Sequence, residues 1–311
     1  MKVTIVGAGN VGATCAQRIV EADMADVYLV DVIAGLARGK ALDLAEAAPV
    51  VGSSRHVEGG EDYAPAAGSD IVVITAGKPR TPGMSRDDLL QVNAAITTSV
   101  VESIIAVAPE ALLLMVANPL DVTTYVAQQV SGLPRERVIG MAGVLDSSRF
   151  RAFIAMELGC CPSEVTAMVL GGHGDSMVPL PRHSTVSGIP VTQLIPVERL
   201  EAIVERTRKG GGEIVSYLKT GSAFYAPSAA VAQMVGSMLR DEKRILPTCV
   251  SLQGEYGLED VFLGVPAVLG SGGMERVIEI ELDEQERAAL QASADQVRAT
   301  IAQWQQLQRG S

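Results

Sequence analysis

The stretch Val3-Thr4-Ile5-Val6-Gly7-Ala8-Gly9-Asn10-Val11-Gly12 decides the fold of this 311-residue chain. Its first four residues predict a buried strand, and the apolar spacing from Val11 to about Ala22 predicts an amphipathic helix. Between them, three glycines form a G-x-G-x-x-G pattern. The first permits a tight turn, the second lets the backbone approach a pyrophosphate, and the third lets helix and strand pack closely. The segment therefore predicts a dinucleotide-binding turn, although glycine punctuation without a ligand is the alternative.

An acidic residue strengthens that prediction. The next apolar run, Val27–Val30, ends in Asp31, which follows Gly12 by 19 residues. A carboxylate at the end of the second strand accepts hydrogen bonds from ribose hydroxyls and repels a 2′-phosphate. The pattern favours NAD over NADP as the bound cofactor, and a solvated carboxylate at a strand end is the alternative.

Apolar runs alternate with amphipathic stretches through the first half of the chain. Such alternation is typical of βαβ units, and right-handed crossovers make the resulting sheet doubly wound. We therefore predict an α/β fold with a doubly wound parallel (Rossmann) sheet. The expected strands are Val3–Val6, Val27–Val30, Ile71–Thr75, Ala111–Val116 and Val138–Met141, and the amphipathic stretches are Val11–Ala22, Leu89–Val107 and Val122–Val130.

The second half has a different rhythm, which predicts a second, α+β domain. A change near Gly143 divides the chain into residues 1–143, a nucleotide-binding domain, and residues 144–311, a substrate domain. The expected elements are helices from Asp146, over Val197–Leu218 and over Phe224–Arg240, a strand at Val165–Leu170, antiparallel strands at Thr248–Leu252, Val261–Val265 and Val277–Leu282, and a closing helix over Asp283–Leu307 with Asp283 and Glu286 at capping-box spacing.

Composition narrows the classes of partner. The chain has 25 basic and 36 acidic residues, for a net charge of −11, so we expect no nucleic-acid partner. The longest apolar run, Ala111 to Ala117, is far shorter than the roughly 18–20 residues of a membrane span, so we expect a cytoplasmic protein with no membrane partner. The four cysteines form no C-x-x-C pair, so we expect neither a disulfide framework nor a metal site.

Polar residues follow several of the predicted strands, where doubly wound sheets bind ligands. Asn118 follows the run Ala111–Met115, and His173 lies between glycines after another strand. Asp146 and Arg149 are three residues apart and therefore share one face of a helix. Each has a structural alternative: an Asx turn for Asn118, a packing role for His173, and a helix cap with a solvated charge for the pair. Glycines beside His173 would leave room for a substrate and a cofactor ring.

A glycine-containing loop, Gly77–Arg86, follows the strand Ile71–Thr75 and carries Arg80 and Arg86. It could be a solvated basic loop. In so acidic a protein, however, arginines gathered on one loop are suited to an anionic ligand over which the loop could close.

These motifs together resemble the lactate/malate dehydrogenase family over essentially the whole chain, and within it the malate dehydrogenases of the lactate-dehydrogenase-like type. The matching segments are GAGNVG at Gly7–Gly12, Asp31, AGKPRTPGMSR at Ala76–Arg86, Asn93, VANP at Val116–Pro119, GVLDSSRFR at Gly143–Arg151 and GGHGD at Gly171–Asp175.

The resemblance implies a hydride-transfer site in which NAD carries the hydride. His173 would donate and accept the proton, Asp146 would hold its imidazole, and Arg149 would bind a substrate carboxylate. Arg86 would polarise the reacting carbonyl, Asn118 would bond the substrate oxygen, and the arginine loop would close as a lid. The implied cofactor-binding residues are Gly7, Ala8, Gly9, Asn10, Val11, Gly12, Asp31, Asn93, Val116, Ala117 and Asn118.

The residue that separates substrates in this family falls on Arg80. An arginine pairs with the second carboxylate of oxaloacetate, whereas glutamine suits the methyl group of pyruvate. With the lid closed, pyruvate would strand a buried charge at a cost of roughly 3–5 kcal/mol. Ala223 agrees, since lactate enzymes of the family tend to carry threonine there. The resemblance thus implies a malate/oxaloacetate dicarboxylate substrate and a role in the tricarboxylic acid cycle.

Three alternatives remain open. An L-lactate dehydrogenase is the nearest, and it is disfavoured by Arg80. An NAD-dependent glycosidase would need a metal held by cysteine and histidine, which the adjacent Cys160 and Cys161 fit poorly. A non-catalytic NAD-binding protein would have lost the residues that this chain keeps. The family forms dimers and tetramers, so a homotetramer or homodimer is implied.

Overall fold

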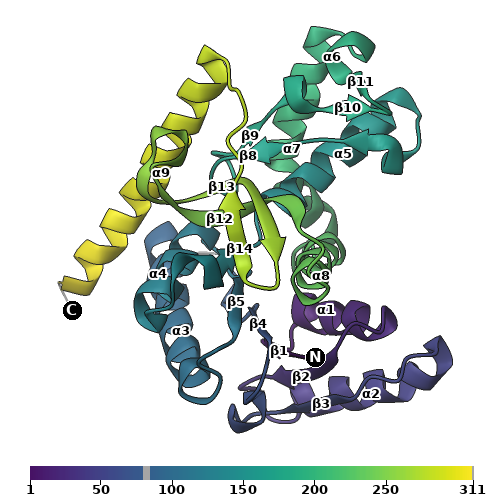
Figure 1. The fold of residues 1–311 in the computed structure, drawn as a ribbon, viewed down its shortest axis with the longest axis vertical. Helices are drawn as coiled ribbons and strands as arrows, with labels where there is room; N and C mark the ends of the chain where they lie inside the picture. The colour runs from purple at the N-terminus through teal and green to yellow at the C-terminus, as the bar shows by residue number, and fades with distance from the viewer. Residues whose placement is uncertain (80–84, 310–311) are drawn as a thin grey trace.

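A computed structural model describes residues 1–79 and 85–309, and in them the chain forms one nine-stranded sheet covered by helices (Figure 1). The strand order is β14-β13-β12-β6-β5-β4-β1-β2-β3. The first half supplies the parallel strands β1 (Lys2–Val6), β2 (Asp26–Val30), β3 (Val57–Gly60), β4 (Ile71–Ile74), β5 (Leu112–Met115) and β6 (Val138–Gly140), with helices α1 (Asn10–Glu21), α2 (Leu36–Val51), α3 (Arg86–Val107) and α4 (Leu120–Ser131).

The parallel part is a doubly wound sheet, as predicted, and its strand order is 3-2-1-4-5-6. Its central strands β4 and β5 are buried along their whole length because helices cover both faces. The strand order reverses between β1 and β4, and ligands bind such sheets at the carboxyl ends of the strands beside this reversal. We call the ends of β1, β4 and β5 the carboxyl edge.

The second half contributes five helices and the remaining strands. Its long strands are antiparallel, as predicted, but they extend the parallel sheet through a pairing of Cys249 with Gly140. The elements are helices α5 (Gly143–Leu158), α6 (Val191–Leu194), α7 (Val197–Leu218), α8 (Tyr225–Leu239) and α9 (Glu284–Arg309), strands β12 (Arg244–Gln253), β13 (Glu259–Gly270) and β14 (Gly273–Val277), and two-residue strands β7 (Val165–Thr166), β8 (Val169–Leu170), β9 (Val178–Pro179), β10 (Thr185–Val186) and β11 (Ile189–Pro190).

Two sequence-based strand predictions were wrong. Val165–Leu170 is not one strand: its two ends pair in different sheets, β7 with β10 and β8 with β9. The predicted strand Val277–Leu282 shares only its first residue with β14, which spans Gly273–Val277. Beyond it, Ile280 donates its N–H to the Tyr256 hydroxyl, so the apolar pattern there reflects side-chain packing and not a strand ladder.

One pair of elements, α2 and β3, was not foreseen at all. Strand β3 reads Val-Glu-Gly-Gly and lacks the β-branched run that marks a strand. It forms because parallel pairing with β2 satisfies its backbone. The closing helix was predicted correctly, including its cap: Asp283 and Glu286 exchange reciprocal side-chain to backbone hydrogen bonds of 2.9 and 3.0 Å.

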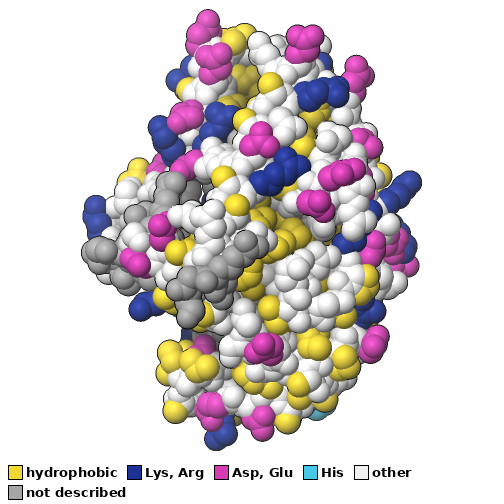
Figure 2. Space-filling view, turned by 90° about the vertical axis from the view of Figure 1, so that its left-hand side faces the viewer, with side chains coloured by type: hydrophobic (Ala, Val, Ile, Leu, Met, Phe, Trp, Pro, Cys, Tyr) yellow, Lys and Arg dark blue, Asp and Glu magenta, His cyan; other side chains and the backbone are white. Residues whose placement is uncertain are grey.

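Charges are interspersed over one face of the molecule. On the face shown in Figure 2, lysine and arginine alternate with aspartate and glutamate. Helix α3 is long and apolar enough, by length and composition, to cross a membrane. In the fold, however, α3 places Val100, Val101 and Ile104 in a buried cluster beneath the sheet.

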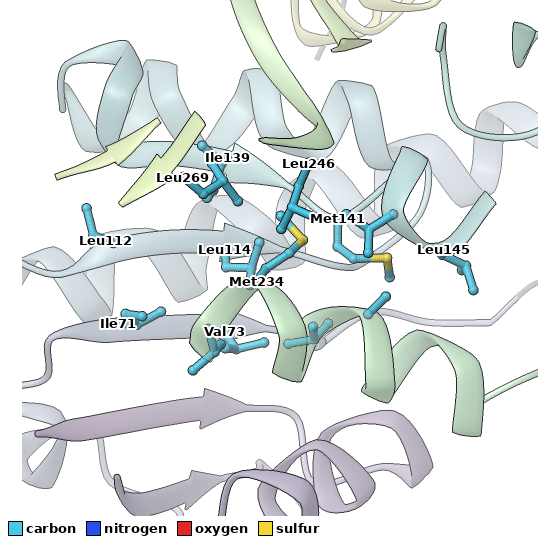
Figure 3. Packing of buried hydrophobic residues seen from close by; sticks show 14 of the residues in the cluster. Ile71, Val73, Leu112, Leu114, Ile139, Met141, Leu145, Met234, Leu246 and Leu269 are labelled. Carbon is cyan, nitrogen blue, oxygen red and sulfur yellow. The ribbon is translucent and has the colours of Figure 1, made fainter. Parts of the chain in front are cut away.

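The main core is shared by both halves of the chain. Figure 3 shows Met234 of α8 among side chains of β4 and β5 from the first half and Leu246 of β12 from the second. The same buried cluster runs from Val3 to Ile301. Because both halves bury surface in it, the parallel sheet and the elements after Gly143 hold each other in a defined geometry.

Candidate active site

The glycine turn after β1 has the conformation that its sequence requires. Gly7 has φ +103°, which favours glycine, and its N–H donates to the Val30 carbonyl at 2.7 Å. A Cβ on Gly12 would lie 1.9 Å from the Gly7 carbonyl oxygen, so only glycine allows α1 to start this close to β1. Asn10 begins α1, and Val11 is half-buried behind it.

Of the three glycines in this turn, Gly9 is the one whose lack of a side chain is not required by packing within the protein. A Cβ there would meet nothing within 4 Å, and φ is −65°, which any residue tolerates. Gly9 also precedes the first turn of α1, where no side chain caps the backbone N–H groups. An open backbone surface at an uncapped helix N-terminus fits a pyrophosphate, so the residues present are suited to a dinucleotide.

Asp31 and a lysine hold the turn in place. Asp31 accepts hydrogen bonds from the N–H groups of Ala8 at 2.7 Å and Ile33 at 3.0 Å. From the other side, the Lys40 ammonium of α2 donates to the Ala8 carbonyl at 2.7 Å. The peptide groups flanking Ala8 are thus held by one anion and one cation. Lys40 was not predicted as a site residue, because the helix that carries it, α2, was not predicted.

Asn93 joins the ends of β4 and β5 at the carboxyl edge. Its buried side chain donates to the carbonyls of Lys78 at 3.1 Å and Asn118 at 2.6 Å, and accepts from the Lys78 N–H at 2.7 Å. These internal bonds occupy its amide group. Asn118 is exposed, Ala117 is buried and Val116 is half-buried, so the predicted ligand segment Val116–Asn118 lies at the end of β5.

His173, Asp146 and Arg149 form one hydrogen-bonded cluster. The His173 Nδ1 lies 2.9 Å from Asp146 Oδ2, and Arg149 Nη1 lies 3.2 Å from Asp146 Oδ1. The Asp146 side chain is 2% exposed, and those of Arg149 and His173 are 13% and 15% exposed. One carboxylate therefore orients both the imidazole and the guanidinium, and it leaves the histidine Nε2 available.

The cluster favours a charged imidazole. Burial by itself lowers the pKa of His173, but the negative charge of Asp146 and its hydrogen bond, with a contribution from Asp121, raise the pKa above its ordinary value. Arg149 opposes the increase. A histidine tuned in this way can donate and accept a proton near neutral pH.

Two of the glycines around His173 have a packing role that the sequence did not predict. A Cβ on Gly171 would lie 2.8 Å from Ser293 Oγ, and one on Gly172 would lie 2.9 Å from a Val297 methyl. These glycines let α9 approach the histidine loop, and Ser293 accepts the Gly172 N–H at 2.8 Å. Only Gly174, with φ +115°, borders open space.

Gly210, in the middle of α7, makes room for Arg149. A Cβ on Gly210 would lie 3.2 Å from Arg149 Cδ, whereas one on the next residue, Gly211, would make an ordinary contact with Nη2 at 3.7 Å. Glycine inside a helix costs about 1 kcal/mol relative to alanine. Gly210 therefore serves the arginine rather than the helix.

Of the two arginines in the predicted lid loop, Arg80 lies outside the described residues. Arg86 is the first residue of α3, which Ser85 caps through a reciprocal bond with Asp88, and the side chain of Arg86 is not described. In the described ranges, no group of three or more histidine, cysteine, aspartate or glutamate side chains could hold a metal ion.

A continuous series of contacts joins the glycine turn to the histidine cluster along the carboxyl edge. The first three contacts link segments that follow neighbouring strands of the sheet, and the last two link helices α4 and α5 to the loop after β8. In order, they are Thr75 Oγ1 to the Gly7 carbonyl at 2.9 Å, Gly77 against Ala117, Asn93 to Asn118 at 2.6 Å, Asp121 to the His173 N–H at 2.9 Å, and His173 to Asp146.

Both halves of the chain match protein-family models. Residues 1–140 match the lactate/malate dehydrogenase NAD binding domain, and residues 143–308 match the lactate/malate dehydrogenase alpha/beta C-terminal domain. A malate dehydrogenase from Roseiflexus castenholzii is 55% identical over 306 residues, which is 98% of this chain and 99% of the relative.

Solved structures agree with the family match. The malate dehydrogenase from Salinibacter ruber superposes with a TM-score of 0.96 at 51% identity, covering 100% of this chain and 99% of that one. A Cryptosporidium parvum lactate dehydrogenase complexed with lactic acid and NAD superposes with a TM-score of 0.94 at 40% identity, covering 97% and 96%. Similar structures thus include enzymes named for two different substrates.

Proposed function

The chain belongs to the lactate/malate dehydrogenase family, and from that membership we propose that it is an NAD-dependent oxidoreductase that interconverts (S)-malate and oxaloacetate. The observation that carries the proposal is the hydrogen-bonded cluster of His173, Asp146 and Arg149, which lies on the same edge as an uncapped glycine turn. The relatives named malate dehydrogenase support the choice of substrate.

NAD, when bound, supplies the hydride acceptor for malate and, as NADH, the hydride donor for oxaloacetate. The open backbone at Gly9 and the N-terminus of α1 would hold its pyrophosphate, and Asp31 would bond a ribose hydroxyl through lone pairs not used on Ala8 and Ile33. Ala8, Asn10 and Val11 complete that binding turn. Val116, Ala117 and Asn118 would contact the nicotinamide side, and Asn93 would hold Asn118 in position.

His173 moves the proton. In oxaloacetate reduction, the protonated imidazole donates from Nε2 to the carbonyl oxygen, and in malate oxidation the neutral imidazole accepts the hydroxyl proton. Asp146 fixes the tautomer and stabilises the imidazolium. Arg149 has donors beyond the one that it directs at Asp146, and these suit a substrate carboxylate. Arg86 would polarise the carbonyl as negative charge develops on oxygen.

Substrate choice rests on Arg80. A guanidinium at this position would pair with the second carboxylate of oxaloacetate and reject pyruvate. The test is NADH oxidation, followed by absorbance, with oxaloacetate and pyruvate as separate substrates. We expect oxaloacetate to be preferred by at least about a hundredfold in kcat/KM; a preference for pyruvate would make the chain a lactate dehydrogenase, and no turnover with either would make it a binding protein.

The pH dependence follows from the raised pKa of His173. Oxaloacetate reduction needs the imidazolium, so its kcat/KM should stay high above pH 6.5 and fall only as pH passes the raised value. Malate oxidation needs the neutral ring and should rise over the same range. Rate profiles in both directions check this. A common inflection below pH 6.5 would contradict the assigned role of Asp146.

We also propose a cytoplasmic enzyme of the tricarboxylic acid cycle that assembles as a homotetramer or homodimer. Exposed apolar side chains on α2 and near the end of α7, including Leu42, Val50 and Tyr217, support self-association. The interspersed surface charges and the net charge of −11 support the absence of nucleic-acid and membrane partners. Residues 1–143 would bind NAD, and residues 144–311 would supply the catalytic histidine.

A further inference from the structure

We propose that Asp121 is a positioning residue for His173: it holds the histidine main chain and adds a second negative charge that stabilises the imidazolium. This inference rests on the proposed function of His173 as the proton carrier. Neither the glycine turn nor the relay between Asp146 and His173 accounts for a carboxylate at this position.

The geometry places His173 between two carboxylates from two helices. Asp146, on α5, bonds the ring at Nδ1, whereas Asp121, in the first turn of α4, accepts the backbone N–H of His173 at 2.9 Å through Oδ2. The contact spans 52 positions in the sequence. The ring and the main chain of one residue are therefore fixed separately, which restricts where Nε2 can point.

Burying the charged Asp121 side chain costs free energy unless a partner stabilises its charge. The residue is 7% exposed, and its Oδ1 makes no hydrogen bond within the described residues. A neutral side chain would avoid that cost. Two features favour a carboxylate here. The first N–H groups of α4 have no carbonyl partner within the helix and stabilise negative charge, and the N–H of His173 donates a hydrogen bond to it.

The charged and titratable groups around this pair are few in the described part of the chain. His173 faces Asp146, Asp121 and Arg149, and Asp121 faces His173 and the buried thiol of Cys249 on β12. Burial raises the pKa of the Asp121 carboxyl above its ordinary value, and the charge of His173, together with hydrogen bonds from the His173 N–H and the Cys249 thiol, opposes that increase. Burial and the Asp121 charge both raise the pKa of Cys249, which keeps this thiol neutral. Because this thiol is neutral, His173 is the partner whose positive charge the Asp121 carboxylate can stabilise.

The test replaces Asp121 with asparagine. Asp121→Asn keeps the shape and a carbonyl acceptor for the His173 N–H, but it removes the charge. The matched control is Asp26→Asn, because Asp26 Oδ1 accepts the backbone N–H of His56 at 3.0 Å, far from the cluster in sequence. The full-length protein is labelled with ¹³C,¹⁵N-histidine, and its three histidines are followed by NMR against pH.

We expect Asp121→Asn to lower the pKa of His173 by about one unit, with no change in Asp26→Asn. The falling limb of the oxaloacetate kcat/KM profile should move to lower pH by the same amount, while KM at low pH changes less than about twofold. A folded Asp121→Asn protein with an unshifted His173 titration would overturn the proposal. A purely structural role would lower stability or kcat without moving either titration.

Two further outcomes keep the inference separate from the proposed function. If the wild type does not reduce oxaloacetate but Asp121→Asn still shifts the His173 titration, the positioning role stands and the function fails. If Asp121→Asn does not fold, the wild-type backbone amide of His173 provides the readout, since an N–H bonded to a carboxylate shifts as that carboxylate titrates. A His173 amide that is insensitive to pH would overturn the proposal.

Discussion

The glycine turn and the histidine cluster lie on one edge of the same sheet, yet their residues are brought together differently. The turn is six consecutive residues, Gly7–Gly12, so its glycine pattern is contiguous in the sequence even though Asp31, Lys40 and Thr75 bond its backbone from farther along the chain. The cluster joins His173 to Asp146 over 27 positions, and Asp121 bonds the His173 main chain from 52 positions away. A contiguous motif can therefore be identified from the amino-acid sequence, whereas the cluster forms only when packing brings its residues within hydrogen-bonding distance.

We expect the largest effect from His173→Asn, which should abolish the function of the histidine cluster without changing that of the glycine turn. His173→Asn removes the proton carrier from the cluster and leaves the turn untouched, so we expect kcat to fall by about 10²–10⁴-fold while NADH affinity stays within twofold. Steady-state kinetics and NADH fluorescence titration measure both. His183→Asn is the matched control, because the His183 ring bonds the Glu281 carbonyl and not the cluster. Near-normal turnover in His173→Asn would mean that another group carries the proton.

Substrate choice should belong to neither region but to the arginine loop. Arg80→Gln should reduce kcat/KM for oxaloacetate by at least about a hundredfold and raise relative activity on pyruvate, because the charge that pairs with the second carboxylate is gone. Kinetics on both oxoacids provide the measurement. Arg38→Gln, an exposed arginine paired with Glu61, serves as the control. Unchanged selectivity would remove Arg80 from this role.

Within the turn, alanine substitutions at two glycines should affect different properties, stability at Gly12 and cofactor affinity at Gly9. Gly12→Ala forces a Cβ to within 1.9 Å of the Gly7 carbonyl, so we expect a loss of roughly 1–3 kcal/mol in the free energy of unfolding. Gly9→Ala meets nothing within 4 Å, so the fold should be unharmed while NADH affinity falls about tenfold, or about 1.4 kcal/mol.

Denaturant unfolding and NADH titration distinguish these two variants. Gly52→Ala, at a positive φ far from the turn, reports the cost of strain alone. Normal NADH binding by Gly9→Ala would show that the open surface at Gly9 does not face the cofactor.

The smallest effect concerns the lysine behind the turn. Lys40→Met removes the ammonium that bonds the Ala8 carbonyl at 2.7 Å, so we expect the Kd for NADH to rise about three- to tenfold, with kcat unchanged. Fluorescence titration measures the affinity. Arg38→Met on the same helix is the control, since Arg38 contacts Glu61 and not the turn. Equal losses in both variants would indicate a general charge effect.

Much of the fold was predictable because its signals are local. Apolar runs such as Ile71–Ile74 predicted central parallel strands, and the capping-box spacing of Asp283 and Glu286 predicted the start of the last helix. Strand β3 was missed because its pairing with β2, and not its composition, stabilises it. Val165–Leu170 was misjudged because periodicity cannot tell which partner strand a short segment will meet.

The candidate site shows the same division. His173, Asp146 and Arg149 could be singled out because glycines and helical spacing mark them. Asp121 and Lys40 carry no such mark: an aspartate after Asn-Pro-Leu resembles any first-turn acid, and Lys40 resembles any surface lysine. Their roles come from one hydrogen bond each to the backbone of a distant segment.

The amino-acid sequence by itself determined the α/β class, the dinucleotide turn and the family, because these depend on residue type and spacing along the chain. Only the tertiary structure decided that the antiparallel strands continue the parallel sheet, that Gly171 and Gly172 admit α9, and that two carboxylates hold one histidine. The physical reason is that burial and hydrogen bonding between distant segments depend on where packing brings them, which no local pattern specifies.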